Sequence, residues 1–161
     1  AKMVKLFEPY STTEVHGFDN FQGMDSPESK PKGQAGDYIG DYERLSRLIS
    51  LQGLDGFCRL NKLDLTKELG SFFAEHPWMR FKCIFLDCSL KDVMQSSLEH
   101  FWPRLVPNGV LILDHYNLET SPDESSIIDD FSGGAAMHQV PYTRSPTAYV
   151  IKPAVSSQAM E

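Results

Sequence analysis

The apolar residues of the chain fall into short blocks whose spacing alternates between that of strands and that of helices. Residues 81–86 and 110–113 are short apolar runs that fit strands buried on both faces of a parallel sheet. Between them, residues 90–105 have the spacing of a helix that ends before the turn signal at 107–109. A right-handed crossover makes two such strands parallel, so their carboxyl ends are expected at one edge of the sheet.

The rest of the chain continues this alternation. The further strands are expected at 13–18, 57–60, 137–142 and 147–152, and the further helices at 37–52, 66–75 and 123–131. The order predicts an α/β fold with a mostly parallel sheet and a C-terminal antiparallel hairpin. We expect one domain at 1–153, which opens on the last turns of a helix at 1–10. A surface loop or lid is expected at 20–36 and a disordered tail at 154–161.

The charge and composition of the chain argue against several classes of binding partner and cellular location. The 161 residues carry a formal net charge of −7 without a basic cluster, which argues against nucleic acid or an anionic membrane as the main partner. No apolar run approaches the roughly 20 residues of a membrane helix and no signal peptide is visible, so a cytoplasmic protein is expected. Cys58, Cys83 and Cys88 form no CxxC pair, which favours buried, reduced thiols.

Four acids follow the apolar runs and are the first candidates for chemistry. Asp87 and Asp114 end the two central runs, while Asp19 and Asp64 follow shorter ones. Two carboxylates brought together repel each other unless a proton or cation intervenes, so a hard divalent ion is one interpretation and two independent caps the other. Asp19 either accepts the hydroxyls of a ribose or caps a turn.

The two residues after Asp114 extend this candidate site. His115 is a metal ligand, a general base or a surface residue, and its place beside a candidate ligand favours the first two. Tyr116 either donates a hydrogen bond to a substrate or packs as an aromatic ring.

Six segments of the chain resemble motifs of the macrocin O-methyltransferase family, a branch of the class I S-adenosylmethionine-dependent methyltransferases. They are residues 16–23 ("GFDTFEGF" in the family), 63–69 ("GDLTKTL"), 85–90 ("YLDCDLY"), 101–110 ("LWPRLVPGGV"), 114–116 ("DDY" or "DEY") and 142–152 ("FTRTPAAYIIK"). The likeness runs in register over nearly the whole chain.

The resemblance implies a Rossmann-like sheet, S-adenosylmethionine as cofactor and a sugar hydroxyl as methyl acceptor. It implies two sets of site residues, for the cofactor Phe18, Asp19, Asp64 and Leu65, and for a Mg²⁺ or Mn²⁺ ion Asp87, Asp114 and His115. Asp19 is expected on the ribose and Asp64 near the adenine. His115 and Asp87 are the expected catalytic residues, because methyl transfer requires a hydroxyl that is oriented and loses its proton.

The chain also departs from the family pattern. Ser89 stands in place of a candidate base, and His115 in place of an acid, which shifts the preference from Mg²⁺ toward Mn²⁺ or Fe²⁺. A glycine-rich first strand is expected to precede Ala1, and no GxGxxG segment stands elsewhere, so we expect an N-terminally incomplete domain with its first strand missing. A sheet without that strand has exposed edges, so a homo-oligomer is expected. Two alternatives are a non-catalytic module that pairs with a copy of itself, and an iron-dependent enzyme of the cephalosporin hydroxylase kind.

Overall fold

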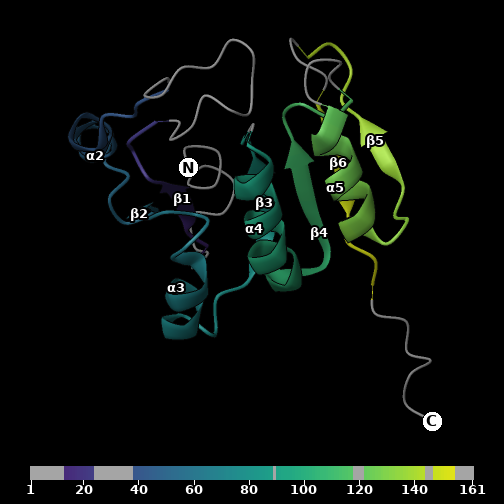
Figure 1. Cartoon of the computed structure of the whole chain (residues 1–161). Coiled ribbons are helices and arrows are strands. Elements are labelled where there is room, and N and C mark those ends of the chain that lie inside the picture. Colours follow the sequence, from purple (N-terminus) through teal and green to yellow (C-terminus); the bar gives the residue numbers. More distant parts are fainter. Residues whose placement is uncertain (1–12, 24–37, 89, 118–121, 144–146, 155–161) are drawn as a thin grey trace. The chain divides into compact units, whose positions relative to one another are not determined.

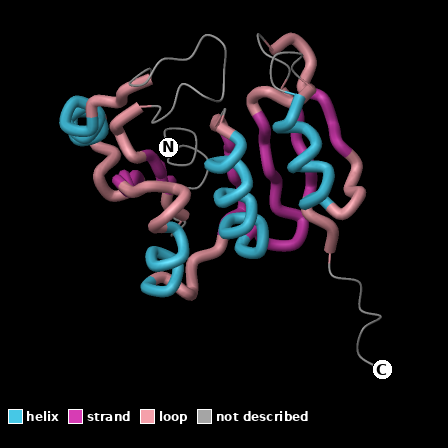
Figure 2. The backbone as a smooth tube through the Cα atoms, in the orientation of Figure 1, coloured by secondary structure: helices cyan, strands magenta, loops and turns pink. Residues whose placement is uncertain are grey.

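The computed structural model describes residues 13–23, 38–88, 90–117, 122–143 and 147–154 (Figures 1 and 2). The chain divides into two compact units, residues 1–65 and 66–161. The expected segments at 1–10 and most of those at 20–36 and 154–161 lie outside the described residues, as does Ser89. Within the described residues, strands and helices alternate as the apolar pattern predicts.

The first unit is a parallel strand pair with a connecting helix. Strand β1 (Val15–Asp19) pairs in parallel with β2 (Cys58–Lys62), and helix α2 (Tyr42–Leu51) lies between them in the sequence. The helix is shorter than the expected 37–52 because Asp41 caps it, accepting a hydrogen bond from the Arg44 amide at 2.9 Å.

The second unit is a four-stranded sheet in the order β3-β4-β6-β5. Its strands are β3 (Phe81–Leu86), β4 (Leu105–Leu113), β5 (Met137–Gln139) and β6 (Ala148–Ile151). Its helices are α3 (Leu69–Glu75), α4 (Lys91–Phe101), the 3₁₀ turn η2 (Trp102–Arg104) and α5 (Pro122–Ser132). Strands β3 and β4 are parallel, whereas β6 is antiparallel to both β4 and β5, which confirms the predicted C-terminal hairpin.

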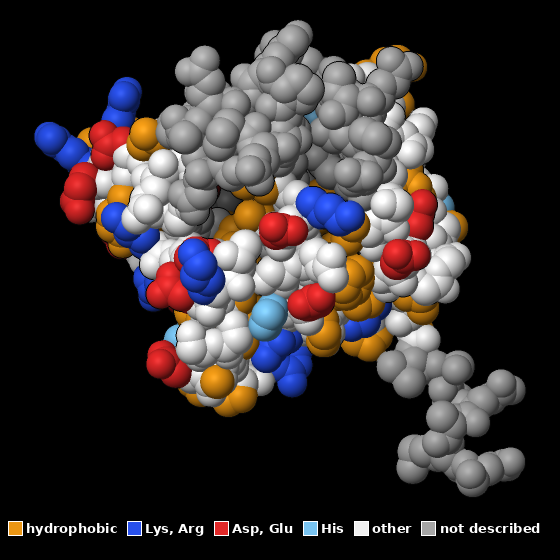
Figure 3. Space-filling model, in the orientation of Figure 1, with side chains coloured by type: hydrophobic (Ala, Val, Ile, Leu, Met, Phe, Trp, Pro, Cys, Tyr) orange, Lys and Arg blue, Asp and Glu red, His pale blue; other side chains and the backbone are white. Residues whose placement is uncertain are grey.

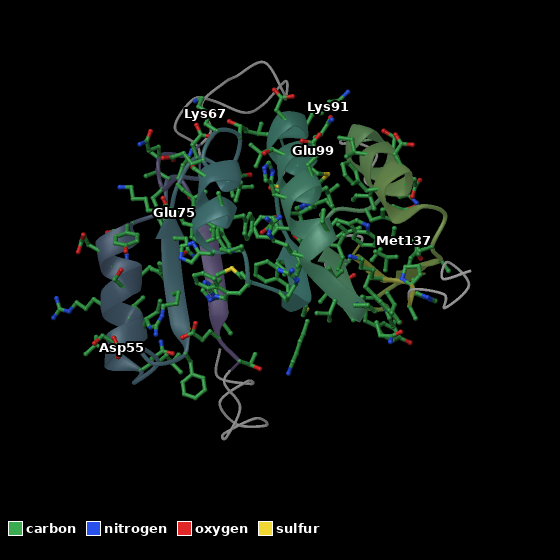
Figure 4. All side chains as sticks on the ribbon, turned by 90° about the horizontal axis from the view of Figure 1, so that it is seen from below. Asp55, Lys67, Glu75, Lys91, Glu99 and Met137 are labelled. Carbon is green, nitrogen blue, oxygen red and sulfur yellow. The ribbon has the colours of Figure 1, made fainter. Side chains whose placement is uncertain are left out.

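Helices α4 and α5 lie on one face of this sheet (Figures 1 and 4). Ile84 and Leu86 of β3 are buried, but Phe85 between them is 59% exposed and Cys83 is exposed as well. Side chains alternate between the faces of a strand, so a cover on one face buries only every second residue. The prediction that β3 is buried on both faces is therefore wrong, and so is the prediction that Cys83 is a buried thiol.

An aromatic cluster fills the space between α3, α4 and the start of β3. The ring of Phe73, 1% exposed, meets the rings of Phe72 and Phe101 edge-on at centroid distances of 5.3 Å and that of Phe81 at 6.2 Å. The guanidinium of Arg104 lies 4.1 Å from the Phe73 ring centroid. Edge-to-face aromatic pairs and a cation over a ring each add to the stabilisation that burial gives.

The turn expected at 107–109 is instead an irregularity inside β4. The register shifts from Phe81 opposite Leu105 to Cys83 opposite Val110. The Asn108 amide donates to the Lys152 carbonyl and the Lys152 amide donates to the Gly109 carbonyl, both at 2.9 Å. Strand β6 thus continues the pairing through a segment that, by itself, reads as a turn.

Gly109 is confined at this irregularity, and Gly109→Ala is expected to destabilise the protein by roughly 1–3 kcal/mol. A Cβ there would lie 2.7 Å from the Val106 carbonyl oxygen and 2.7 Å from a Leu105 methyl group. Gly56→Ala is the matched control, because a Cβ at Gly56 meets nothing within 4 Å. Urea unfolding of both variants checks the prediction, and equal unfolding free energies would contradict it.

Candidate functional site

Asp87 and Asp114 leave the sheet side by side. Leu86 and Leu113 are register partners at the ends of the parallel strands β3 and β4, and each acid is the next residue of its strand. The Asp114 amide donates to the Leu86 carbonyl at 3.2 Å, which continues the ladder to the acids themselves. Parallel pairing therefore brings together two carboxylates that stand 27 positions apart in the sequence.

The ring of His115 completes an acid–histidine cluster of Asp87, Asp114 and His115. Its Nδ1 lies 3.9 Å from Asp87 Oδ1 and its Nε2 lies 3.5 Å from Asp114 Oδ2. One ligand atom of each residue lies within 4.8 Å of the other two. The side chains of Asp87, Asp114 and His115 are 58%, 29% and 25% exposed, so the cluster is open to solvent.

A positive charge would stabilise the two neighbouring carboxylates of the cluster. Two carboxylates at this spacing repel each other, and either a proton on His115 or a divalent cation offsets that repulsion. Carboxylate oxygens with one imidazole nitrogen form a donor set that suits Mg²⁺, Mn²⁺ or Fe²⁺. The residues present therefore fit a divalent cation.

Tyr116 has a structural partner instead of the substrate hydrogen bond considered from the sequence. Its hydroxyl donates to Asp129 Oδ1 of α5 at 3.1 Å. Burial, the hydrogen bond to Asp129 and the charge of that carboxylate together raise the pKa of the Tyr116 phenol. The phenol therefore stays protonated at neutral pH and keeps its donor. Nothing in the local sequence indicates Asp129 as its partner, because a helix expected at 123–131 leaves open which of its sides faces Tyr116.

The four candidate cofactor residues lie in the first unit, at the carboxyl edge of β1 and β2. Asp19 is the register partner of Lys62, and its carbonyl accepts from the Leu63 amide at 3.0 Å, one residue before Asp64. The Asp19 carboxylate is exposed, and its Oδ1 accepts from the Phe21 amide in a turn. This is the turn role that the sequence left open, and it leaves Oδ2 of Asp19 without a partner among the described residues.

A shallow pocket of about 460 Å³ lies next to these residues. It is lined by Phe21, Ile39, Gly40, Asp41, Tyr42, Glu43 and Lys62. None of the four candidate cofactor residues lines it, but Phe21 is hydrogen-bonded to Asp19 and Lys62 is paired with it. The Phe21 and Tyr42 rings meet edge-on at 5.1 Å, so the wall of the pocket is aromatic.

The face drawn in Figure 3 has a mixed charge distribution. On that face acidic and basic side chains are interspersed among apolar ones, and no large patch of one sign forms in the part that is described. None of the helices that the structure describes has the length and apolar character that crossing a membrane requires.

Comparison with known proteins identifies the fold. No model of a known protein family matches the sequence, and no curated protein matches it. The crystal structure of CalS11, calicheamicin methyltransferase, superposes with a TM-score of 0.80 at 20% identity over 93% of this chain and 65% of that one. The O-methyltransferase NovP gives 0.74 at 17% identity over 94% and 64%. The chain thus spans about two thirds of the length of these structures.

These likenesses define the class to which the architecture belongs, the Rossmann-like α/β fold of class I methyltransferases. The fold by itself does not define what a protein of this class acts on. An rRNA methylase from Streptococcus thermophilus shares it more distantly, with a TM-score of 0.52 at 12% identity over 89% of both chains. Function has to be argued from the site residues.

Proposed function

We propose that the chain belongs to an S-adenosylmethionine-dependent O-methyltransferase that acts on a sugar hydroxyl with the help of a divalent cation. The observation that carries the proposal is the acid–histidine cluster at the carboxyl edge of β3 and β4 in a methyltransferase fold. CalS11 is described as a TDP-rhamnose 3'-O-methyltransferase, which supports the choice of a sugar hydroxyl. The fold likeness does not favour the alternative of a non-catalytic assembly module.

Asp87, Asp114 and one nitrogen of His115 would hold the cation, Mg²⁺ or Mn²⁺, and the imidazole nitrogen favours Mn²⁺ of the two. When bound, such an ion lowers the pKa of a coordinated hydroxyl and orients it. An imidazole that gives one nitrogen to a cation carries its proton on the other, so His115 cannot accept a second proton while it is a ligand. The free carboxylate oxygen of Asp87, the most exposed group of the cluster, then accepts the proton.

The transfer itself is a displacement at carbon. S-adenosylmethionine would supply the methyl group on its sulfonium, and its thioether, S-adenosylhomocysteine, would be the leaving group when the acceptor oxygen takes the methyl. The hydroxyl proton passes to Asp87, or to a free ring nitrogen of His115 when that residue is not a ligand. The chain contributes orientation of the hydroxyl and removal of its proton.

For the cofactor, we propose that Oδ2 of Asp19 accepts a ribose hydroxyl and that Asp64 lies near the adenine, with Phe18 and Leu65 beside them. The turn formed by Asp19 and the Phe21 amide supports this, because it fixes the carboxylate while leaving one oxygen for a ligand. Cytoplasmic location and homo-oligomerisation remain predictions.

Asp19→Asn is expected to weaken binding of S-adenosylhomocysteine about tenfold or more, because a hydrogen bond to a charged group contributes about 1.5–3 kcal/mol. Asparagine keeps the oxygen that accepts from the Phe21 amide, so the turn is preserved and only the charge is lost. Asp55→Asn, an exposed acid of the same unit, is the matched control. Calorimetry with and without Mn²⁺ measures both, and a wild-type chain that binds in neither condition would refute the enzymatic claim for this chain.

A further inference from the structure

Two consecutive residues that follow the acid–histidine cluster are bound to one helix. The Tyr116 hydroxyl donates to Asp129 Oδ1 at 3.1 Å, and the Asn117 amide donates to Ser125 Oγ at 2.8 Å. Ser125 and Asp129 are four residues apart on α5, so they lie on the same side of that helix. The helix is thus hydrogen-bonded to the segment after His115 at two points one turn apart.

Helix α5 is itself a fixed support. Ile127 and Ile128 are 8% and 1% exposed and belong to the core of the second unit, and Ser125 is 8% exposed. A buried hydroxyl that accepts a backbone N–H is costly to remove, because the amide loses a partner where water has little access. The two hydrogen bonds therefore connect the segment after His115 to the hydrophobic core.

Direct contacts with the two carboxylates do not fix the ring of His115. Its ring nitrogens lie 3.9 and 3.5 Å from the carboxylate oxygens of Asp87 and Asp114, which is too far for strong hydrogen bonds. On one side of His115, the Asp114 amide is bound to the Leu86 carbonyl. On the other side, the backbone turns sharply, since Asn117 has φ of 58°, a conformation that asparagine tolerates better than most residues.

We propose that Ser125 and Asp129 are positioning residues of the acid–histidine cluster. They hold Tyr116 and Asn117, place the His115 ring between the two carboxylates, and so set the affinity of the cluster for a divalent cation. Neither residue touches the cation or the substrate in this proposal. The inference rests on the proposed function only for the cation, and the placement of the ring is independent of it.

The test compares Asp129→Ala with Asp129→Asn and Asp130→Ala. Alanine at 129 removes the acceptor, asparagine keeps an oxygen that accepts from Tyr116 but removes the charge, and Asp130→Ala removes the same charge from the next, exposed position of α5. Mn²⁺ titration followed by electron paramagnetic resonance is expected to show about 3–10-fold weaker binding for Asp129→Ala, less than the roughly 10–100-fold loss for a direct partner of a ligand, because Asp129 acts through Tyr116. Asp129→Asn and Asp130→Ala should bind within about twofold of wild type, because no partner is lost.

A second measurement uses the metal-free protein. NMR of Asp129→Ala is expected to show shifted His115 ring resonances, and NMR of Ser125→Ala is expected to show faster hydrogen exchange at the Asn117 amide, because each variant removes one of the two bonds. Asp130→Ala should show neither change. Unchanged ring resonances, or equal losses of Mn²⁺ affinity in Asp129→Ala and Asp130→Ala, would overturn the inference. A wild type that binds no Mn²⁺ would contradict the proposed function, and the NMR comparison would still decide the role of α5. Should Asp129→Ala fail to fold, Tyr116→Phe removes the same hydrogen bond through loss of one oxygen atom.

Discussion

Asp114→Asn is expected to lower the affinity of the chain for Mn²⁺ on the order of 100-fold or more. Loss of a partner outside the ligand shell commonly costs 10–100-fold, so loss of a charged ligand should reach at least the upper end of that range. Asparagine keeps the shape of the side chain, and the Asp114 backbone amide that donates to the Leu86 carbonyl is unaffected. The strand pairing that positions the cluster should therefore survive the substitution.

The same variant has a second expected result of opposite sign. Without a cation, Asp87 and Asp114 repel each other, so removal of one charge should leave the free energy of unfolding unchanged or slightly increased. Substitution of an acid that only binds the cation thus lowers the Mn²⁺ affinity of the protein without lowering its stability. Substitution of an acid that also has a structural role lowers both.

Glu75→Gln is the matched control for this charge change. Glu75 is an exposed acid at the carboxyl end of α3, in the same unit (Figure 4). Titration with Mn²⁺ and urea unfolding of the two variants measure both effects. Equal Mn²⁺ affinity in Asp114→Asn and Glu75→Gln would show that the cluster does not bind the ion.

The placement of the two acids follows from sequence because it depends only on strand order and register. Once 81–86 and 110–113 are taken as parallel neighbours, the residue after each run must emerge at the same edge. His115 comes with Asp114 as its chain neighbour. The hydrogen bonds from Tyr116 and Asn117 to α5 cannot be predicted in this way, since they depend on how the helix is rotated about its axis. A helix predicted at 123–131 leaves open which residues face Tyr116.

The errors in the fold have a similar origin. An apolar run shows that a strand can be buried, but not which of its faces a helix covers, and Phe85 lies on the face of β3 that is largely exposed. Pro107-Asn108-Gly109 has the composition of a turn, but the backbone of Lys152 supplies hydrogen bonds that keep this segment in the sheet. Lys152, which decides the second outcome, lies more than 40 residues from Asn108, and a local pattern carries no information about so distant a partner.

Phe73→Ala is expected to cost about 3–5 kcal/mol of stability, the largest effect of any substitution considered for the fold. The substitution leaves a cavity beside the rings of Phe72, Phe81 and Phe101, whose edge-on contacts all converge on Phe73. It also removes the ring beneath the Arg104 guanidinium. Burial, and then the nearby charge of Arg80, already lower the pKa of Arg104, so its cation gains from the ring that the substitution deletes.

Trp78→Ala is the matched control for Phe73→Ala, because it also removes an aromatic ring, but an exposed one. The indole is larger than the phenyl ring of Phe73 and lies in the same unit, but it is 71% exposed. Its removal should change the unfolding free energy by less than about 1 kcal/mol, because little apolar surface is returned to water. Urea unfolding followed by far-UV circular dichroism, with the slope compared between variants, measures both costs. A loss for Trp78→Ala as large as that for Phe73→Ala would mean that contacts of the segment after α3 stabilise this unit as much as the buried ring does.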